Sequence, residues 1–412
     1  MKKHIYRAKN VNKINWDKVA KQLSGEASVF AIDVAKEKQY ALLTNADNSV
    51  SELIWWNHPE QTREVLTALE GLSCTLDIVM ESTGTYGDAL RHQFRQSGFS
   101  IYQMNAKRVS DAKEIYDGVP SMHDAKSVTV ITRLHAEGLS KPWVELTDEE
   151  RDMDALRREY DMHHTQYQRN QNRLEAFLSR HWPEIGNLLD LDSVTLESLL
   201  IEYGSPACIA ADAEGAAKKI RRWGKSLLSD EKIERVIKSA CHSLGQPCTA
   251  IEISYLQALA EEMRHSRLQQ KQAKEALESF VQRDDGLKEL SNIIGIITTG
   301  ILLSCHLDPR RFDSAHSLQK ALGLNLKEKS SGRHVGQLKI TKRGSSTARS
   351  YLYFAALRLI KSNPVAKAWY LNKVDPRAKN KTVIAVMRKL AKALWYVGRG
   401  EPFDANKLFT IG

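Results

Sequence analysis

The chain has 412 residues, 42% of them hydrophobic, which is enough for two or three domains with real cores. Its formal net charge of +10 favours a polyanionic partner. No apolar run is long enough to span a membrane, and the N-terminal residues lack the apolar stretch of a signal peptide. The five cysteines are scattered without a CxxC pair, which is typical of buried thiols in a reducing cytosol.

Residues 1–27 are predicted to form a polar leader with one helix around Trp16 to Leu23. Residues 28–145 alternate strand and helix patterns, with strands near 29–34, 39–45, 50–55, 76–81 and 99–104 and helices near 60–70, 86–97 and 124–137. Three strands followed by alternating helices and strands predict an α/β domain of ribonuclease H-like order. Lys141-Pro142-Trp143 marks the exit from this domain.

Three carboxylates and one hydroxyl occupy the ends of these elements. Asp33 and Glu81 each end an apolar run, and Asp124 begins a helical stretch that also contains Ser127. Two strand ends and a helix start can meet at one edge of a sheet, where hard oxygen ligands suit Mg²⁺. Each acid alone is more often structural, and Glu81 could cap the next helix. Together Asp33, Glu81 and Asp124 favour a nuclease-like metal site.

Residues 146–285 contain two long, charged helical segments, about 147–182 and 249–284, on either side of a helical insert at about 184–248. Apolar residues recur along each segment in a narrow seam, a pattern suited to coiled-coil packing. The spacing leaves two interpretations open. The pair forms an antiparallel stalk or dimerisation arm, or it belongs to a helical bundle within one subunit.

The C-terminal part, residues 286–412, is predicted to be mainly helical and is strongly basic. Between Lys327 and Arg399 there are 18 lysines and arginines against two acids, Glu328 and Asp375, a net charge of +16, so the rest of the chain sums to −6. Tyrosines and tryptophans are interleaved with these cations. The composition predicts binding to a phosphate backbone.

Two local motifs lie in this part. Residues 290–300 resemble a helix-hairpin-helix, which presents backbone N–H groups to a phosphate, although Ile297 stands where a second glycine is usual; a purely structural turn fits equally well. Further on, Ser330 and Ser331 precede Gly332 among basic residues. A serine in such surroundings can act as a nucleophile, although a Ser-Gly pair is more often a turn.

Three stretches carry a resemblance to a known family: FAIDVAKEKQYALL around Asp33, VMESTGTYG around Glu81, and GLNLKEKSSGRHVGQLKITKRGSSTARSYLYFAAL. They resemble the Piv/MooV-type DEDD transposases, insertion-sequence recombinases. The resemblance covers roughly residues 28–140 and 286–400. It implies a RuvC-like, ribonuclease H-like N-terminal domain and a C-terminal transposase domain that bears a serine.

The resemblance also implies a chemistry. The acidic residues bind Mg²⁺, and the serine directly before glycine, Ser331 with Ser330 as the fallback, attacks the scissile phosphate to form a phosphoserine–DNA link. A bridge RNA acts as guide by pairing with double-stranded donor and target DNA, and homodimers pair into a synaptic tetramer. The cations of the serine region are then expected to contact nucleic acid: Lys329, Arg333, Lys339, Lys342, Arg343 and Arg349.

The chain departs from the family at its last acidic pair, a D-x-x-D-A pattern. Asp124 takes the third acidic position and Ser127 the fourth; in an alternative register Ser121 stands at the third. Asp117 is close enough in sequence to compensate for the missing carboxylate. Two other functions therefore remain open: a metal-dependent Holliday-junction-type nuclease without a covalent intermediate, and an inactive, transposase-derived nucleic-acid-binding protein.

Overall fold

The computed structural model describes residues 8–410 with the exception of 24–26, 46–47, 82–83, 117, 120–122, 329–335 and 337. The chain divides into two compact units, residues 1–145 and 146–412. The division lies just beyond Trp143, at the exit of the α/β region that the sequence predicts.

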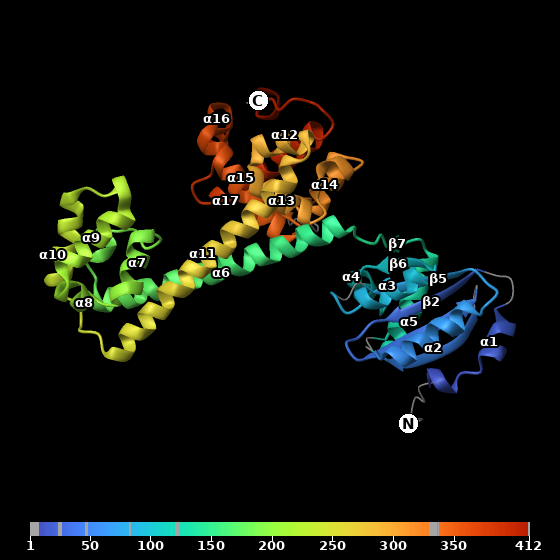
Figure 1. The fold of residues 1–412 in the computed structure, drawn as a ribbon. Coiled ribbons are helices and arrows are strands. Elements are labelled where there is room, and N and C mark those ends of the chain that lie inside the picture. Colours follow the sequence, from blue (N-terminus) through green and yellow to red (C-terminus); the bar gives the residue numbers. More distant parts are fainter. Residues whose placement is uncertain are drawn as a thin grey trace. The chain divides into compact units, whose positions relative to one another are not determined.

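A mixed sheet forms the centre of the first unit (Figure 1). Its strands in the described residues are β1 (Lys9–Asn10), β2 (Ser28–Asp33), β3 (Lys38–Asn45), β4 (Asn48–Trp56), β5 (Leu76–Glu81), β6 (Ser100–Met104) and β7 (Lys141–Pro142). They lie in the order β1-β4-β3-β2-β5-β6-β7. β2, β3 and β4 are antiparallel, whereas β5 and β6 run parallel to β2. Three antiparallel strands followed by two parallel ones agree with the order expected from the sequence.

The two faces of this sheet pack against different helices, because side chains alternate along each strand. Phe30 and Ile32 of β2 join the core beneath α1 (Trp16–Gln22), α2 (Pro59–Glu70) and α3 (Asp88–Gln96). Ala31 and Val79 face the other side, with α4 (Ala106–Ala112) and α5 (Asp124–Ala136). By the same alternation, Asp33 and Glu81 belong to the α5 face.

Residues 8–23 are part of this unit, so the expectation of a separate leader needs correction. β1 pairs with β4, and Val11, Val19 and Leu23 are buried in the core beside α2. The segment looks polar because only these few positions face inward. α4 and β7 were also not expected: α4 has seven residues and buries only Val109 and Ala112, too few to produce a helical period.

Two long helices run through the second unit, α6 (Asp148–His181) and α11 (Ala250–Gln282), each opened by a capping box. They pack side by side, as the green and yellow helices of Figure 1 show. The pairing is antiparallel, because cross-contacts run from Glu149–Arg283 through Tyr167–Arg267 to Phe177–Tyr255. The two seams therefore meet within one chain.

The insert between these helices folds around its own core. It comprises α7 (Val194–Tyr203), α8 (Pro206–Ala211), α9 (Ala213–Gly224) and α10 (Asp230–Cys241). Trp182 is fully buried there together with Leu196, Leu199 and Ile220. Leu174 and Leu178 of α6 and Met263 of α11 complete the cluster, so the insert and the helix pair share one apolar interior.

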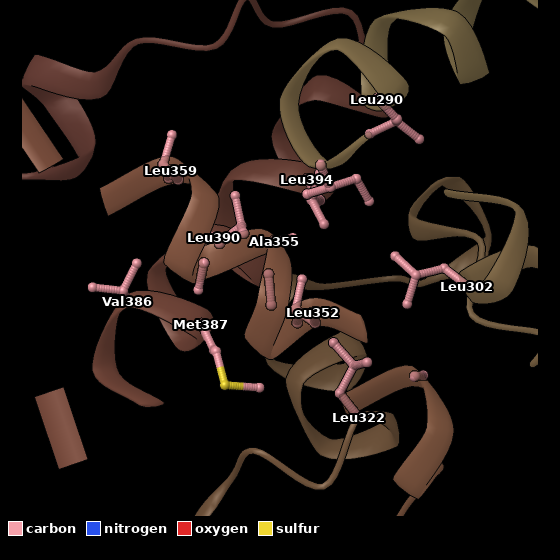
Figure 2. Packing of buried hydrophobic residues seen from close by; sticks show 14 of the residues in the cluster. Leu290, Leu302, Leu322, Leu352, Ala355, Leu359, Val386, Met387, Leu390 and Leu394 are labelled. Carbon is pink, nitrogen blue, oxygen red and sulfur yellow. The ribbon is translucent and has the colours of Figure 1, made fainter. Parts of the chain in front are cut away.

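The remaining helices form a second core. They are α12 (Asp285–Ile294), α13 (Ile296–Ser304), α14 (Ala315–Ala321), α15 (Ser346–Ser362), α16 (Pro364–Lys373), α17 (Lys379–Val397) and α18 (Ala405–Leu408). Figure 2 shows Leu352 and Ala355 of α15 among Leu302, Leu322, Met387 and Leu390 from α13, the end of α14, and α17. Two strands, β8 (Leu326–Lys327) and β9 (Lys339–Ile340), pair antiparallel beside this core.

The candidate helix-hairpin-helix is the corner between α12 and α13, where Gly295 has a φ of +82°. The Arg358 guanidinium covers this corner: it donates to the Ile294 carbonyl and, at 3.1 Å, to the Thr298 hydroxyl. α13 itself is buried from Thr298 to Ser304. These contacts favour the structural interpretation of the motif.

Among the described residues, no single helix has the length and apolarity needed to cross a membrane. α12 and α13 reach that length and apolarity only when taken together, and the angle between them is 116°.

Candidate functional site

The acidic residues expected to form the site come from adjacent strand ends. Asp33 is the last residue of β2 and Glu81 the last of β5, and the parallel register pairs Ile32 with Met80 one step before them. Both carboxylates therefore stand at the same edge of the sheet. α5 packs on this face and begins at Asp124, with His123 as its N-cap. The alternation of side chains along the strands explains why the acids gather here.

Ser127, one helical turn after Asp124, is buried, with 3% of its surface exposed. Its hydroxyl donates to the His123 carbonyl at 3.4 Å and also lies close enough to the Asp33 carboxylate to lower the pKa of that group. Burial raises the pKa of Asp33, the Asp124 carboxylate adds to the rise, and the Ser127 hydroxyl opposes it. Ser127, which one of the two registers places at the fourth acidic position, thus lies beside the first acidic residue.

Glu81 is coupled to the same group. Burial raises the pKa of Glu81, and repulsion from Asp33 raises it further. The Lys113 ammonium, just after α4, lowers the pKa of both carboxyls. Sequence reasoning missed Lys113, because a single lysine in a polar connection between helices carries no distinguishing pattern.

Within the residues that the structure describes, no three acidic, histidine or cysteine side chains are close enough to hold a metal ion. The chemistry of the donors nevertheless fits a hard divalent cation. Asp33 and Glu81 supply carboxylate oxygens, and a bound cation would offset the repulsion from Asp33 that raises the pKa of Glu81. The predicted convergence of Asp33, Glu81 and Asp124 on one ion stays a prediction.

The predicted nucleophile lies outside the described residues, as do several neighbours: Ser331, Ser330, Lys329, Arg333, Asp117 and Ser121. The described residues on either side of the serine segment are tied together. The Thr341 N–H donates to the Asn325 carbonyl at 2.9 Å, and the Lys342 N–H donates to the Gly323 carbonyl at 3.0 Å. Gly344 packs so tightly here that a Cβ would lie 2.1 Å from the Ala321 carbonyl oxygen. This explains the glycine that follows Lys342-Arg343.

The cations expected to contact nucleic acid divide into two kinds. Lys339, Lys342 and Arg343 are exposed, and Lys342 has the unusual φ of +57°. Arg349 is half-buried: its Nη1 donates to the carbonyls of Leu322, at 3.1 Å, and Gly344, at 2.9 Å. Burial lowers the pKa of Arg349. Its guanidinium is therefore already used to join the two backbone segments that flank the serine region.

Two known protein-family models match the chain, one over the region of the acidic residues and one over the region of the predicted serine. A DEDD transposase model of the IS110 type matches residues 30–183, which include Asp33, Glu81, Asp124 and α6. A second model, described as Transposase IS116/IS110/IS902 family, matches residues 290–371, which include Ser331 and Arg349. No curated protein matches the chain. The chain therefore carries both transposase domains of the IS110/IS116/IS902 family and is a DNA transposase.

Proposed function

We propose that this transposase cuts and rejoins donor and target DNA through a covalent phosphoserine–DNA intermediate, with Ser331 as the nucleophile. Attack of the Ser331 oxygen on the scissile phosphorus, with loss of the hydroxyl proton, forms a P–O bond to the enzyme. The P–O bond to the 3′ or 5′ oxygen of the cut strand breaks, and that oxygen takes up a proton and leaves as a hydroxyl. Attack by a strand oxygen on the phosphoserine then rejoins DNA and restores the serine. The observation that carries the proposal is the presence of both domains, with the partly buried Asp33 and Glu81 and the buried Ser127 on one face of the sheet.

Asp33, Glu81 and Asp124 would hold a divalent cation, which we take to be Mg²⁺. DEDD transposases typically depend on a divalent metal. When bound, the cation supplies positive charge against the charge that develops on the phosphate. The Ser127 hydroxyl favours the ionised form of Asp33 and leaves the fourth acidic position without a negative charge. Fewer protein charges around the cation predict weaker metal affinity than a four-carboxylate site would have.

The exposed cations Lys339, Lys342 and Arg343 would hold the phosphate backbone next to the serine, with Lys329 and Arg333 on the intervening segment. We further propose that a bridge RNA selects the donor and target sites and that homodimers combine into a tetramer at synapsis. The net charge of +16 between Lys327 and Arg399 supports binding of polyanions in general.

The test is a denaturing gel of the protein incubated with donor and target duplexes, Mg²⁺ and a transcript of the non-coding flank of its gene. Wild type should carry a covalently attached DNA strand, Ser331→Ala should not, and Ser330→Ala should remain competent. A reaction without the transcript tests the proposed guide RNA, because the covalent adduct should then be lost. Loss of the adduct in Ser330→Ala with retention in Ser331→Ala would move the nucleophile by one residue.

The same gel separates the competing functions. A nuclease that uses metal-activated water yields cut DNA without an adduct in any lane. A protein that only binds nucleic acid yields neither, whichever divalent metal is supplied. An adduct that persists in both serine variants would end the serine mechanism.

A further inference from the structure

We propose that the turn between α16 and α17, residues 373–381, is a separate contact for the phosphodiester backbone of nucleic acid. We call it the basic turn. It lies beyond residue 371, where the second family match ends. Its cations contribute to the net charge of +16 given above, but none of them belongs to the group expected to contact nucleic acid beside the serine. The inference rests on the proposed function only in requiring that the protein binds nucleic acid.

The basic turn concentrates unpaired positive charge. Four cations are exposed in it: Lys373, Arg377, Lys379 and Lys381. None of them forms an ion pair with an acid in the described part of the chain. Asp375 is the acid within the turn, and its carboxylate accepts the Arg377 backbone N–H at 2.8 Å. An ordinary solvated face mixes both signs of charge more evenly than this segment, which has four exposed cations and one acid.

The backbone of the turn is held in one conformation. The Ala378 N–H donates to the Asp375 carbonyl at 2.9 Å, and the Lys381 N–H donates to the Ala378 carbonyl at 2.8 Å. The Thr382 hydroxyl closes the turn on the Lys373 carbonyl at 3.3 Å. From α15, the Tyr353 hydroxyl donates to the Asn380 side chain at 3.1 Å. A fixed backbone lowers the entropy lost when the four cations engage a ligand.

The start of α17 adds an electrostatic argument. Its first turn contains Lys379 and Lys381 and no acid, and the N-cap Ala378 makes no side-chain capping bond. Cations at the positive end of a 19-residue helix are unfavourable for folding. α6 and α11 begin in the opposite way, with capping boxes and acidic residues. An anion bound at the basic turn would offset this repulsion.

A nucleic-acid strand matches this arrangement because it carries a phosphate at every nucleotide, so several neighbouring cations can be neutralised by one ligand. Duplex DNA and folded RNA share that chemistry. The shared ligand is therefore the phosphodiester backbone, and the two sources are distinguished by experiment.

The experiment measures binding in EDTA, in the Ser331→Ala background, so that it does not depend on cleavage. The test variant combines Lys373→Gln, Arg377→Gln, Lys379→Gln and Lys381→Gln. The control removes the same four charges from exposed positions of the insert, by Arg222→Gln, Lys232→Gln, Arg235→Gln and Lys238→Gln. Affinity for an unrelated 30-base-pair duplex and for a folded RNA is followed as salt is raised.

Each lost phosphate contact should reduce the slope of log affinity against log salt by about 0.9 on duplex DNA and about 0.7 on single strands. The test variant should therefore lose roughly 2 to 4 in slope on at least one of the two ligands, and the control less than about 1. Loss on one ligand alone identifies the source. Equal slopes for test and control variants on both ligands would overturn the proposal, whereas a wild type without binding would instead overturn the proposed function.

Thermal unfolding guards against misfolding of the test variant. Removing Lys379 and Lys381 from the helix start should leave the unfolding temperature unchanged or raise it. If the unfolding temperature of the test variant falls, the single variants Lys379→Gln and Lys381→Gln are measured in its place. Each should lower the slope of log affinity against log salt by about 1 without a change in stability. Two single variants with unchanged slopes would also overturn the proposal.

Discussion

Arg267→Met should loosen the insert from the helix pair, because it removes the charge that compensates a buried carboxylate. The side chain of Glu197, on α7, is 3% exposed, and its Oε2 lies 2.6 Å from a guanidinium nitrogen of Arg267 on α11. This nitrogen approaches Oε2 outside hydrogen-bonding geometry, so the contact is electrostatic. The same guanidinium lies over the Tyr167 ring of α6.

The magnitude follows from the burial of the two partners. Removing one partner of a buried ion pair costs about 3–5 kcal/mol. Arg267 is 28% exposed and Arg264 also lowers the pKa of Glu197, so part of the compensation remains. We therefore expect the local free energy of opening to fall by about 2–3 kcal/mol, below the full cost of a broken pair. Arg267→Met with Glu197→Gln, which removes both charges, should recover most of the loss.

The loss should also depend on pH in a defined direction. Burial raises the pKa of Glu197, and Arg267 and Arg264 oppose this rise. Without Arg267 the pKa rises further, so the folded protein holds the Glu197 proton more tightly than the unfolded chain does. The destabilisation is then largest above the folded pKa and disappears as pH falls towards about 4.3, the ordinary value for glutamate.

The measurement is hydrogen–deuterium exchange of peptides from α7, compared between wild type, Arg267→Met and the double variant at two pH values. A loss below about 1 kcal/mol, or a double variant as loose as the single one, would refute the assignment of the effect to an unpaired Glu197.

Three further outcomes are expected. Mg²⁺ should raise the unfolding temperature of the wild type, and Asp33→Asn should abolish this shift in calorimetry; an equal shift in the variant would place the cation elsewhere. Gly245→Ala should destabilise by about 1–3 kcal/mol in urea unfolding, because its Cβ would lie 2.1 Å from the His181 carbonyl oxygen, whereas Gly186→Ala, with nothing within 4 Å, should be neutral. Arg349→Lys keeps the charge but loses the paired bonds to two carbonyls. It should lower the unfolding temperature and leave the salt dependence of nucleic-acid binding unchanged. An unchanged unfolding temperature with an altered salt dependence would instead make Arg349 a phosphate contact.

The placement of Asp33 and Glu81 at neighbouring strand ends was predictable from sequence because strand alternation and strand ends are local properties. The apolar runs that end in Asp33 and Glu81 predict the edge of the sheet at which these residues lie and the face that they share. The helical pattern of the residues after Asp124 predicts that a helix begins there. The proximity of Ser127 to Asp33 was only partly predictable. One of the two possible registers placed Ser127 at the fourth acidic position, but the proximity itself depends on the packing of α5 on β2.

Other features depend on contacts between residues far apart in the chain, which sequence patterns do not encode. Val11 and Val19 stand in a polar segment, and only the pairing of β1 with β4 shows why they are buried. Arg349 looked like one more cation in a basic region until its bonds to Leu322 and Gly344 assigned it to the frame of the serine segment. Lys113 acts on two carboxylates that are distant in sequence.

The antiparallel pair also orders events during synthesis. α6 ends at His181 and α11 begins at Ala250, so on the ribosome the first helix is complete while its partner has not yet been translated. At about 5–20 residues per second the delay is several seconds, much longer than helix formation requires. In that interval the seam of α6 is exposed, and its two polar buried positions, Asn170 and His181, limit how strongly it attracts other nascent chains. Completion of α11 then both covers the seam and closes the insert, before the helices of the C-terminal core are translated.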